Sequence, residues 1–299
     1  MTHPRRLADV LKERSMKVVC YVCALISIVT TFGIVAVLAT EAFSFFQKVS
    51  IVEFFTSTKW SPIIKPNSYG VLPLFCGTFL ITLGAAIIAV PLGLMAAIYL
   101  SELAHPRVRI IIKPLLELLA GIPTVVYGFF AVFYVTPVLQ KIIPSVQVFN
   151  AASGAIVVGI MVLPLVSSLC EDAIAAVPKS LREGGYALGA TKLEVTAKIT
   201  LPAALSGISA AVILAVSRVV GETMAVTLAA GATPKLTLNP AESIQTMTAY
   251  IVQISKGDTP NGTIEYQTIF AVGATLFCTT LAMNVLANKL VRRYRQVYH

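Results

Sequence analysis

Six long runs of apolar residues, separated by shorter polar segments, dominate the chain. A helix needs about 20 apolar residues to cross the hydrocarbon layer of a membrane. The runs of this length are Val18–Thr40, Pro66–Ser101 with its spanning part near Leu72–Leu100, Leu118–Gln140, Ala151–Cys170, Ile208–Ala230 and Tyr266–Asn288. The pattern therefore predicts six transmembrane helices and no separate soluble domain.

The composition supports the same class of protein. Apolar residues make up 57% of the 299 residues and charged residues only 12%, against about 45–50% and about 25% in soluble domains. The mean hydropathy is +0.83. This excludes a soluble globule, which cannot bury so much apolar surface, and a disordered chain, which needs low hydrophobicity and high charge. We expect an all-α integral membrane protein.

The distribution of Lys and Arg predicts how the helices are oriented, because cytoplasmic loops carry an excess of these residues. With the N-terminus inside, sixteen Lys and Arg residues fall in cytoplasmic segments and six in outer loops. This predicts cytoplasmic tails over residues 1–17 and 291–299, a membrane domain over 18–290 and a cytoplasmic loop over 173–205. The first run is not a cleavable signal, because it exceeds the usual apolar core and no A-x-A site follows it.

Several kinds of chemistry are missing from the sequence. No G-x-x-x-x-G-K-[ST] motif is present to cradle ATP phosphates, and the three histidines are scattered over the termini and a loop. Cys20 and Cys23 form a CxxC inside the first apolar run, where packing against another helix is the simpler interpretation. We expect no catalytic site, no metal, no cofactor and no nucleic-acid partner, and the net charge of +9 then reflects membrane topology.

The cytoplasmic loop carries signals for two helices. Ser180 with Glu183, and Thr191 with Glu194, have the spacing of a capping box at a helix start. Gly189 between them can adopt the left-handed conformation that ends a helix. We therefore predict a short helix, a turn and a longer helix. A folded cytoplasmic loop is either a docking surface or a connector that touches only its own bundle.

The same loop resembles the motif of ABC importer permeases, E-A-A, three residues, G, nine residues, I-x-L-P. The matching residues are Glu183, Gly189, Ile199, Leu201 and Pro202, with Gly184 and Gly185 in place of the alanines. We expect Pro202 to interrupt the helix before the fifth run. The resemblance implies that the loop inserts a coupling helix into a separate ATPase subunit. The coupling residues that it implies are Glu183, Gly189, Ala190, Leu201 and Pro202.

Further stretches between Tyr69 and Leu290 resemble the phosphate-specific (Pst) importers, and their C-type permease subunit more than the A-type one. The most specific is GETMAV at Gly221–Val226, preceded by SRVV. This resemblance implies the type I ABC importer permease (MetI-like) fold in a bacterial inner membrane. It also implies a heterodimer with an A-type permease subunit, two copies of an ATPase subunit and an external phosphate-binding protein.

Arg218 and Glu222 are the charged residues inside the fifth run. Four residues apart, they share a helix face, and such residues normally face a bundle interior and often mark a substrate path. Arginine offers a planar donor fork that matches phosphate oxygens. We therefore predict an anion path at Arg218 and Glu222, with hydroxyls of Thr223 and Ser217 beside it. A self-neutralising ion pair is the alternative.

Other interpretations stay open from the sequence. The cargo is phosphate by the resemblance, but another oxyanion such as molybdate, sulfate or phosphonate uses the same machinery. A membrane sensor scaffold is a further alternative, whereas an intramembrane enzyme lacks paired catalytic groups. At the cytoplasmic side we expect Lys113 to pair with Glu117, and Glu171 and Asp172 to be solvated.

Overall fold

The computed structural model describes residues 7–257, 259–260 and 262–294, and describes side chains within residues 13–289. The described part contains six helices that are long and apolar enough to cross a membrane. They are Glu13–Phe46, Leu72–Leu103, Thr124–Ile142, Ala151–Ala175, Lys192–Val220 and Ile264–Lys289. The prediction of six spans in an all-α protein is therefore confirmed.

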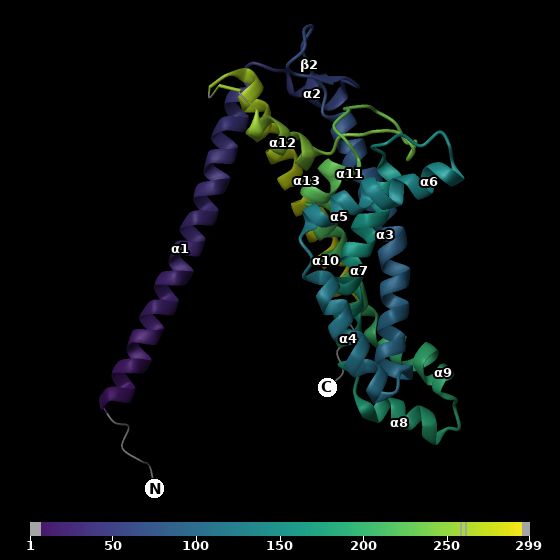
Figure 1. The fold of residues 1–299 in the computed structure, drawn as a ribbon. Coiled ribbons are helices and arrows are strands. Elements are labelled where there is room, and N and C mark those ends of the chain that lie inside the picture. The colour runs from purple at the N-terminus through teal and green to yellow at the C-terminus, as the bar shows by residue number, and fades with distance from the viewer. Residues whose placement is uncertain (1–6, 258, 261, 295–299) are drawn as a thin grey trace.

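Helices account for most of the described chain (Figure 1). The elements are α1 (Leu7–Phe46), α2 (Ile51–Thr56), β1 (Trp60–Ser61), β2 (Ser68–Tyr69), α3 (Leu72–Ile98), η1 (Tyr99–Leu103), α4 (Pro106–Ala120), α5 (Thr124–Phe130), η2 (Ala131–Val135), α6 (Thr136–Ile142), α7 (Ala151–Ala175), α8 (Lys179–Ala187), α9 (Lys192–Val195), η3 (Thr196–Thr200), α10 (Leu201–Val220), α11 (Met224–Ala229), α12 (Met247–Lys256) and α13 (Ile264–Tyr294). The three η elements are turns of π-helix. The two short strands pair antiparallel, with Trp60 opposite Tyr69.

The centre of the bundle is the contact between α3 and α7, the most extensive helix–helix contact in the molecule. Small residues allow it, as is usual where helices associate within a membrane. A Cβ added at Gly93 would lie 2.7 Å from Val166, and one added at Gly84 would lie 2.7 Å from Ala155. The two backbones therefore approach too closely for larger side chains at these positions.

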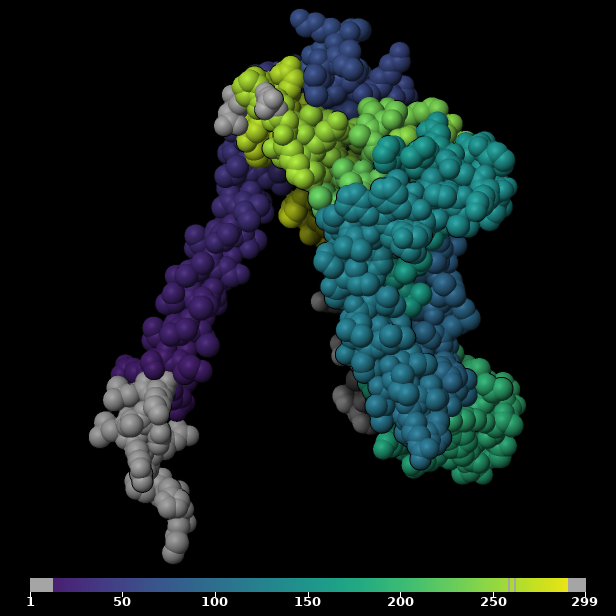
Figure 2. All heavy atoms as spheres, in the orientation of Figure 1, coloured from purple at the N-terminus to yellow at the C-terminus, as the bar shows by residue number. Residues whose placement is uncertain are grey.

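Helix α1 leans away from the bundle (Figure 2). It contacts α13 near the outer side of the molecule, and the most hydrophobic stretch of α1 is unburied. Because its exposed residues are apolar, this length of helix is suited to lipid or to another apolar surface rather than to water. The predicted tails are partly helical, since α1 begins at Leu7 and α13 reaches Tyr294, while residues 1–6 and 295–299 lie outside the described part.

Two predicted spans have different limits in the structure. The third run contains a break, because α4 ends at Ala120 and α5 begins at Thr124, after Pro123. Proline disfavours helical geometry in the residue before it, so the chain turns there. In the fifth run the continuous helix covers Lys192–Val220 rather than Ile208–Ala230, and α11 follows as a separate short helix.

The loop that is predicted to be cytoplasmic has the expected order of short helix, turn and longer helix. Gly189 has a φ of +82° after α8, and the capping box of Thr191 and Glu194 is present. The first predicted cap is wrong, because Pro178 occupies the N-cap position of α8 and Ser180 falls inside the helix. Pro202 also does not interrupt the helix, because it lies in the first turn of α10 directly after the π-turn η3. A π-turn changes the hydrogen-bond register and so accommodates the proline.

Candidate functional site

The Arg218–Glu222 pair lies at the end of the fifth spanning helix. Helix α10 ends at Val220, and Glu222 follows the turn at Gly221, so the two residues do not share the face of a continuous helix as predicted. They nevertheless meet, because Arg218 Nη1 donates to Glu222 Oε2 at 2.7 Å. The Glu222 side chain is 3% exposed and that of Arg218 is 46% exposed. The guanidinium therefore lies at the surface of the protein, and the carboxylate is buried beneath it.

Two of the other hydrogen bonds of Glu222 tie it to the helices that follow. Its Oε1 accepts from Ala225 N at 3.3 Å, in the first turn of α11. Its backbone carbonyl accepts from Thr248 Oγ1, in α12, at 2.8 Å. The residue thus joins the ends of α10, α11 and α12. Arg218 donates to Glu222 from Nη1. A guanidinium has five N–H donors in all, and this hydrogen bond uses one of them.

The two predicted hydroxyl residues form contacts inside the protein. Ser217 Oγ donates to Asn284 Oδ1, on α13, at 2.7 Å. Thr223 Oγ1 donates to the Gly221 carbonyl at 3.1 Å. Since a hydroxyl has one hydrogen to donate, neither offers a donor to an anion in this conformation. The geometry leaves Arg218 as the cationic group of the site.

At the end of the bundle that is predicted to be cytoplasmic, a buried carboxylate replaces the expected solvated one. Glu171, near the end of α7, is 2% exposed in its side chain and pairs with Arg109 and with Lys113, whose Nζ lies 3.4 Å away. Lys113 therefore reaches Glu171 rather than its predicted partner Glu117. The reason is that α4 packs against the end of α7. Asp172 is exposed, as predicted.

A second buried pair at this end was not anticipated from the sequence. Arg182 on α8 lies 3.1 Å from Glu102 in η1, and its side chain also donates to the carbonyl of Ile174 at 2.7 Å. No local pattern signals this pair, because its members lie on segments distant in the sequence. The structure thus adds Glu102, Arg182 and Glu171 to the polar groups that hold the cytoplasmic end together.

The coupling loop presents an apolar tip around the predicted coupling residues. Glu183 is exposed, and Gly189 lies in the turn that reverses the chain between α8 and α9. The exposed fractions of Leu188 and Leu193 are 89% and 66%. Exposed apolar clusters with polar neighbours are typical of contact surfaces. Ala190 lies in the same turn as Gly189, whereas Leu201 and Pro202 lie in the first turn of α10.

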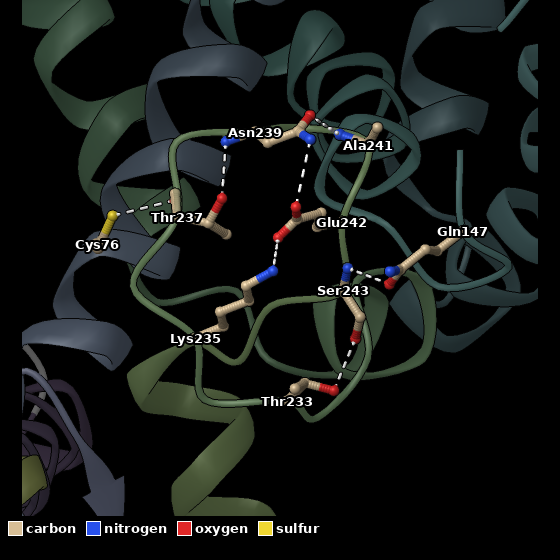
Figure 3. Close-up of polar contacts among 9 residues, drawn as sticks. All are labelled: Cys76, Gln147, Thr233, Lys235, Thr237, Asn239, Ala241, Glu242 and Ser243. Atoms are coloured by element: carbon tan, nitrogen blue, oxygen red, sulfur yellow. Dashed lines mark hydrogen bonds and ion pairs between the residues drawn. The ribbon is translucent and has the colours of Figure 1, made fainter. Parts of the chain in front are cut away.

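On the opposite side of the molecule, polar side chains hold the loop between α11 and α12 (Figure 3). Lys235 pairs with Glu242, and Asn239 Nδ2 donates to Glu242 Oε1 at 3.4 Å. The Ser243 amide donates to Gln147 Oε1 at 2.8 Å. The nearby Lys235 ammonium lowers the pKa of Glu242. The loop is therefore ordered by its own charges and by the segment before α7.

Comparison with known proteins identifies the chain. Residues 89–296 match the family described as binding-protein-dependent transport system inner membrane component. The chain belongs to this family. It is 37% identical over 284 residues to a probable ABC transporter permease protein, YqgH, of Bacillus subtilis, with 94% of this chain and 90% of the relative covered. It is 33% identical over 262 residues to the phosphate transport system permease protein PstC of Xylella fastidiosa, with 81% and 79% covered.

Solved structures show the same fold. An alginate ABC transporter complexed with its periplasmic protein matches with a TM-score of 0.68 at 15% identity, over 99% of this chain and 100% of that one. The inward-facing methionine transporter MetNI matches with a TM-score of 0.57 at 17% identity, over 76% and 95%. The chain therefore has the MetI-like permease fold. It is a multi-pass inner-membrane component of an ABC importer and not a catalytic subunit.

Members of this family work with ATPase subunits, a second permease and a substrate-binding protein. The loop motif and GETMAV predict this family, and the comparisons confirm it.

Proposed function

We propose that the chain is the C-type permease subunit of an ATP-driven phosphate importer. The observation that carries the proposal is the half-exposed guanidinium of Arg218, anchored to the buried carboxylate of Glu222 at the end of a spanning helix. A charged group at membrane depth is costly and is typical of an ion or substrate path. The phosphate transport relatives support phosphate as the cargo.

The arrangement of the pair suggests how an anion passes. An oxyanion meets Arg218 first, because Glu222 lies behind it, and the fork of N–H donors suits phosphate oxygens. Glu222 neutralises part of the charge of Arg218, so the anion is held weakly and leaves again. A protonated phosphate oxygen can also donate a hydrogen bond to the carboxylate, which fully ionised sulfate cannot do. The pair thus favours phosphate over sulfate.

Phosphate uptake by variants of the two residues tests this path. We expect Arg218→Gln to lower uptake by about tenfold or more, in the range of losses seen when a charged hydrogen bond is removed. Glu222→Gln is expected to reduce the preference for phosphate over sulfate. Lys256→Gln, at an exposed cation in the last turn of α12, serves as the control. Unchanged uptake and selectivity in both site variants would refute the proposal.

We propose that the partners are an A-type permease subunit, two copies of an ATPase subunit that hydrolyses ATP, and an external phosphate-binding protein. In this arrangement residues 18–290 form the permease domain, both termini lie in the cytoplasm, and loop 173–205 docks on the ATPase. The exposed apolar tip at Leu188 and Leu193 supports docking over a mere connector, because a connector has no need of exposed leucines.

Co-purification tests the docking role. We expect Glu183→Arg, at the exposed face of α8, to lose the ATPase while retaining the second permease subunit. Asp172→Arg is the matched control, because Asp172 is also an exposed cytoplasmic carboxylate but lies outside the motif. Retention of the ATPase by Glu183→Arg would contradict docking at this helix.

A further inference from the structure

Arg182 joins the coupling helix to the cytoplasmic end of the bundle. Its guanidinium lies 3.1 Å from the Glu102 carboxylate, which belongs to η1 at the end of the α3 segment. The side chain of Glu102 is 5% exposed and that of Arg182 is 19% exposed. The pair is thus removed from water, and its geometry is constrained by the packing around it rather than by solvent.

The same guanidinium makes a second contact with a different helix. Its Nη2 atom donates to the backbone carbonyl of Ile174 at 2.7 Å, and Ile174 is a fully buried residue near the end of α7. The last carbonyls of a helix lack partners within the helix and attract cations. Arg182 therefore fastens α8 to both α3 and α7, the two helices in contact at the centre of the bundle (Figure 1).

Two consecutive residues of α8 differ in their surroundings. Glu183 is exposed, whereas Arg182 is directed to the bundle. Gly185, on the same short helix, approaches Val195 and Ile199 so closely that an added Cβ would lie 2.6 Å from Ile199. The inner side of α8 is therefore held by the contacts of Arg182, by the close packing of Gly185 and by Leu181, which packs against the core, whereas Glu183 is exposed.

The contacts of the buried Glu171 extend this connection. Glu171 binds Arg109 and Lys113 and so ties α4 to the end of α7. Helix α4 leads through the break before Pro123 to α5, and α5 packs on α11, where a Cβ at Gly128 would lie 2.8 Å from Leu228. Helix α11 directly follows Glu222. Packed elements thus connect the coupling helix with the site at Glu222.

We propose that Arg182 is a positioning residue that transmits movement of α8 to α3 and α7, so that ATP hydrolysis is coupled to transport. The proposal rests on the proposed function, since it assigns the connection behind the docking surface. The physical reason is geometric. The hydrogen bond from Arg182 to the Ile174 carbonyl fixes direction as well as distance, and the ion pair with the buried Glu102 holds the guanidinium in place. Apolar contact alone permits α8 to slide on the bundle.

The test measures phosphate transported per ATP hydrolysed, in the complete complex reconstituted in liposomes. Arg182→Met removes the charge, the ion pair with Glu102 and the hydrogen bond to Ile174, but keeps a long side chain. We expect the variant to retain the ATPase on purification and to hydrolyse ATP, while the phosphate-to-ATP ratio falls by about tenfold, within the usual range of coupling effects. Arg182→Lys keeps the charge and should recover part of the ratio. Lys179→Met, at an exposed cation of the same helix, should leave it unchanged.

Each alternative result has a definite meaning. The inference is overturned if the phosphate-to-ATP ratio of Arg182→Met stays within about twofold of the wild type, well below the range of coupling effects. It is also overturned if the variant loses the ATPase, because Arg182 would then be a docking or folding residue. If Arg182→Met does not assemble, Glu102→Gln decides, because it removes the charge that pairs with Arg182 while keeping the size of the side chain. An assembled Glu102→Gln complex with the wild-type ratio overturns the inference, and a lowered ratio supports it. A wild-type complex that moves no phosphate refutes the proposed function itself.

Discussion

Removing Arg218 and removing Glu222 should affect the stability of the protein very differently. Arg218→Met leaves the Glu222 carboxylate at 3% exposure with the Ala225 amide as its remaining side-chain partner, at 3.3 Å. Breaking a buried ion pair in this way typically costs about 3–5 kcal/mol, because a charge stays buried without compensation. Glu222→Gln leaves a guanidinium that is 46% exposed and that water reaches along the proposed transport path, so we expect a loss of about 1 kcal/mol or less.

The double variant Arg218→Met/Glu222→Gln provides the decisive comparison. It removes both charges, and the glutamine oxygen can still accept from the Ala225 amide, so its stability should return to within about 1 kcal/mol of the wild type. The resulting coupling energy between the two positions should reach about 2–3 kcal/mol, at the upper end for contacting residues. Uptake should remain low in the double variant, because the cation is absent.

Unfolding of the full chain in mixed micelles of increasing SDS content measures these differences. Trp60 is the single tryptophan of the sequence and packs edge-on against Tyr250 at 4.9 Å between ring centroids, so its fluorescence reports the outer end of the bundle. Circular dichroism reports loss of helix in parallel. Equal losses of stability for the two single variants would refute the reasoning, since they would mean that Glu222 is not desolvated.

Two further predictions concern the loops on either side of the membrane. Gly184→Ala should stabilise α8 by up to about 1 kcal/mol, because alanine is the better helix former and nothing lies within 4 Å of the new Cβ. Gly185→Ala should cost about 1 kcal/mol through its clash with Ile199. Hydrogen exchange of residues 179–187 compares the two variants, and equal protection would contradict the assigned packing. In the loop between α11 and α12, Lys235 lowers the pKa of Glu242. The stabilisation of the loop by this ion pair is therefore fully present at a pH above the ordinary glutamate pKa of about 4.3, and it is lost as the pH falls through the lowered pKa. An NMR titration of the Glu242 carboxyl should show a midpoint below that value, and the midpoint should rise in Lys235→Met; a midpoint unaffected by the lysine would count against the pair.

The number of spans and the family were predictable because each depends on short stretches of sequence. A bilayer requires about 20 apolar residues per helix, and six such runs are present. Local motifs were predictable for the same reason. The capping box of Thr191 and Glu194 forms as expected, and Gly189 adopts the positive φ that its place between two helices required.

Helix ends were less predictable where two local signals competed. The apolar run to Ala230 predicted one long span, but the helix ends at Val220 and resumes at Met224. Ser180 had the spacing of a helix cap, but Pro178 holds the N-cap position. Hydropathy reports how apolar a segment is and not whether its backbone continues through a glycine or a polar residue.

The pairing of charges from segments distant in the sequence could not be predicted. Glu171 would be solvated on its own helix end, and only the approach of α4 surrounds it with Arg109 and Lys113. Glu102 and Arg182 likewise meet because α8 folds back beneath the ends of α3 and α7. Apolar length and helix caps follow from neighbours along the chain, but burial of a charge and the choice of its partner depend on segments that come together only when the bundle packs.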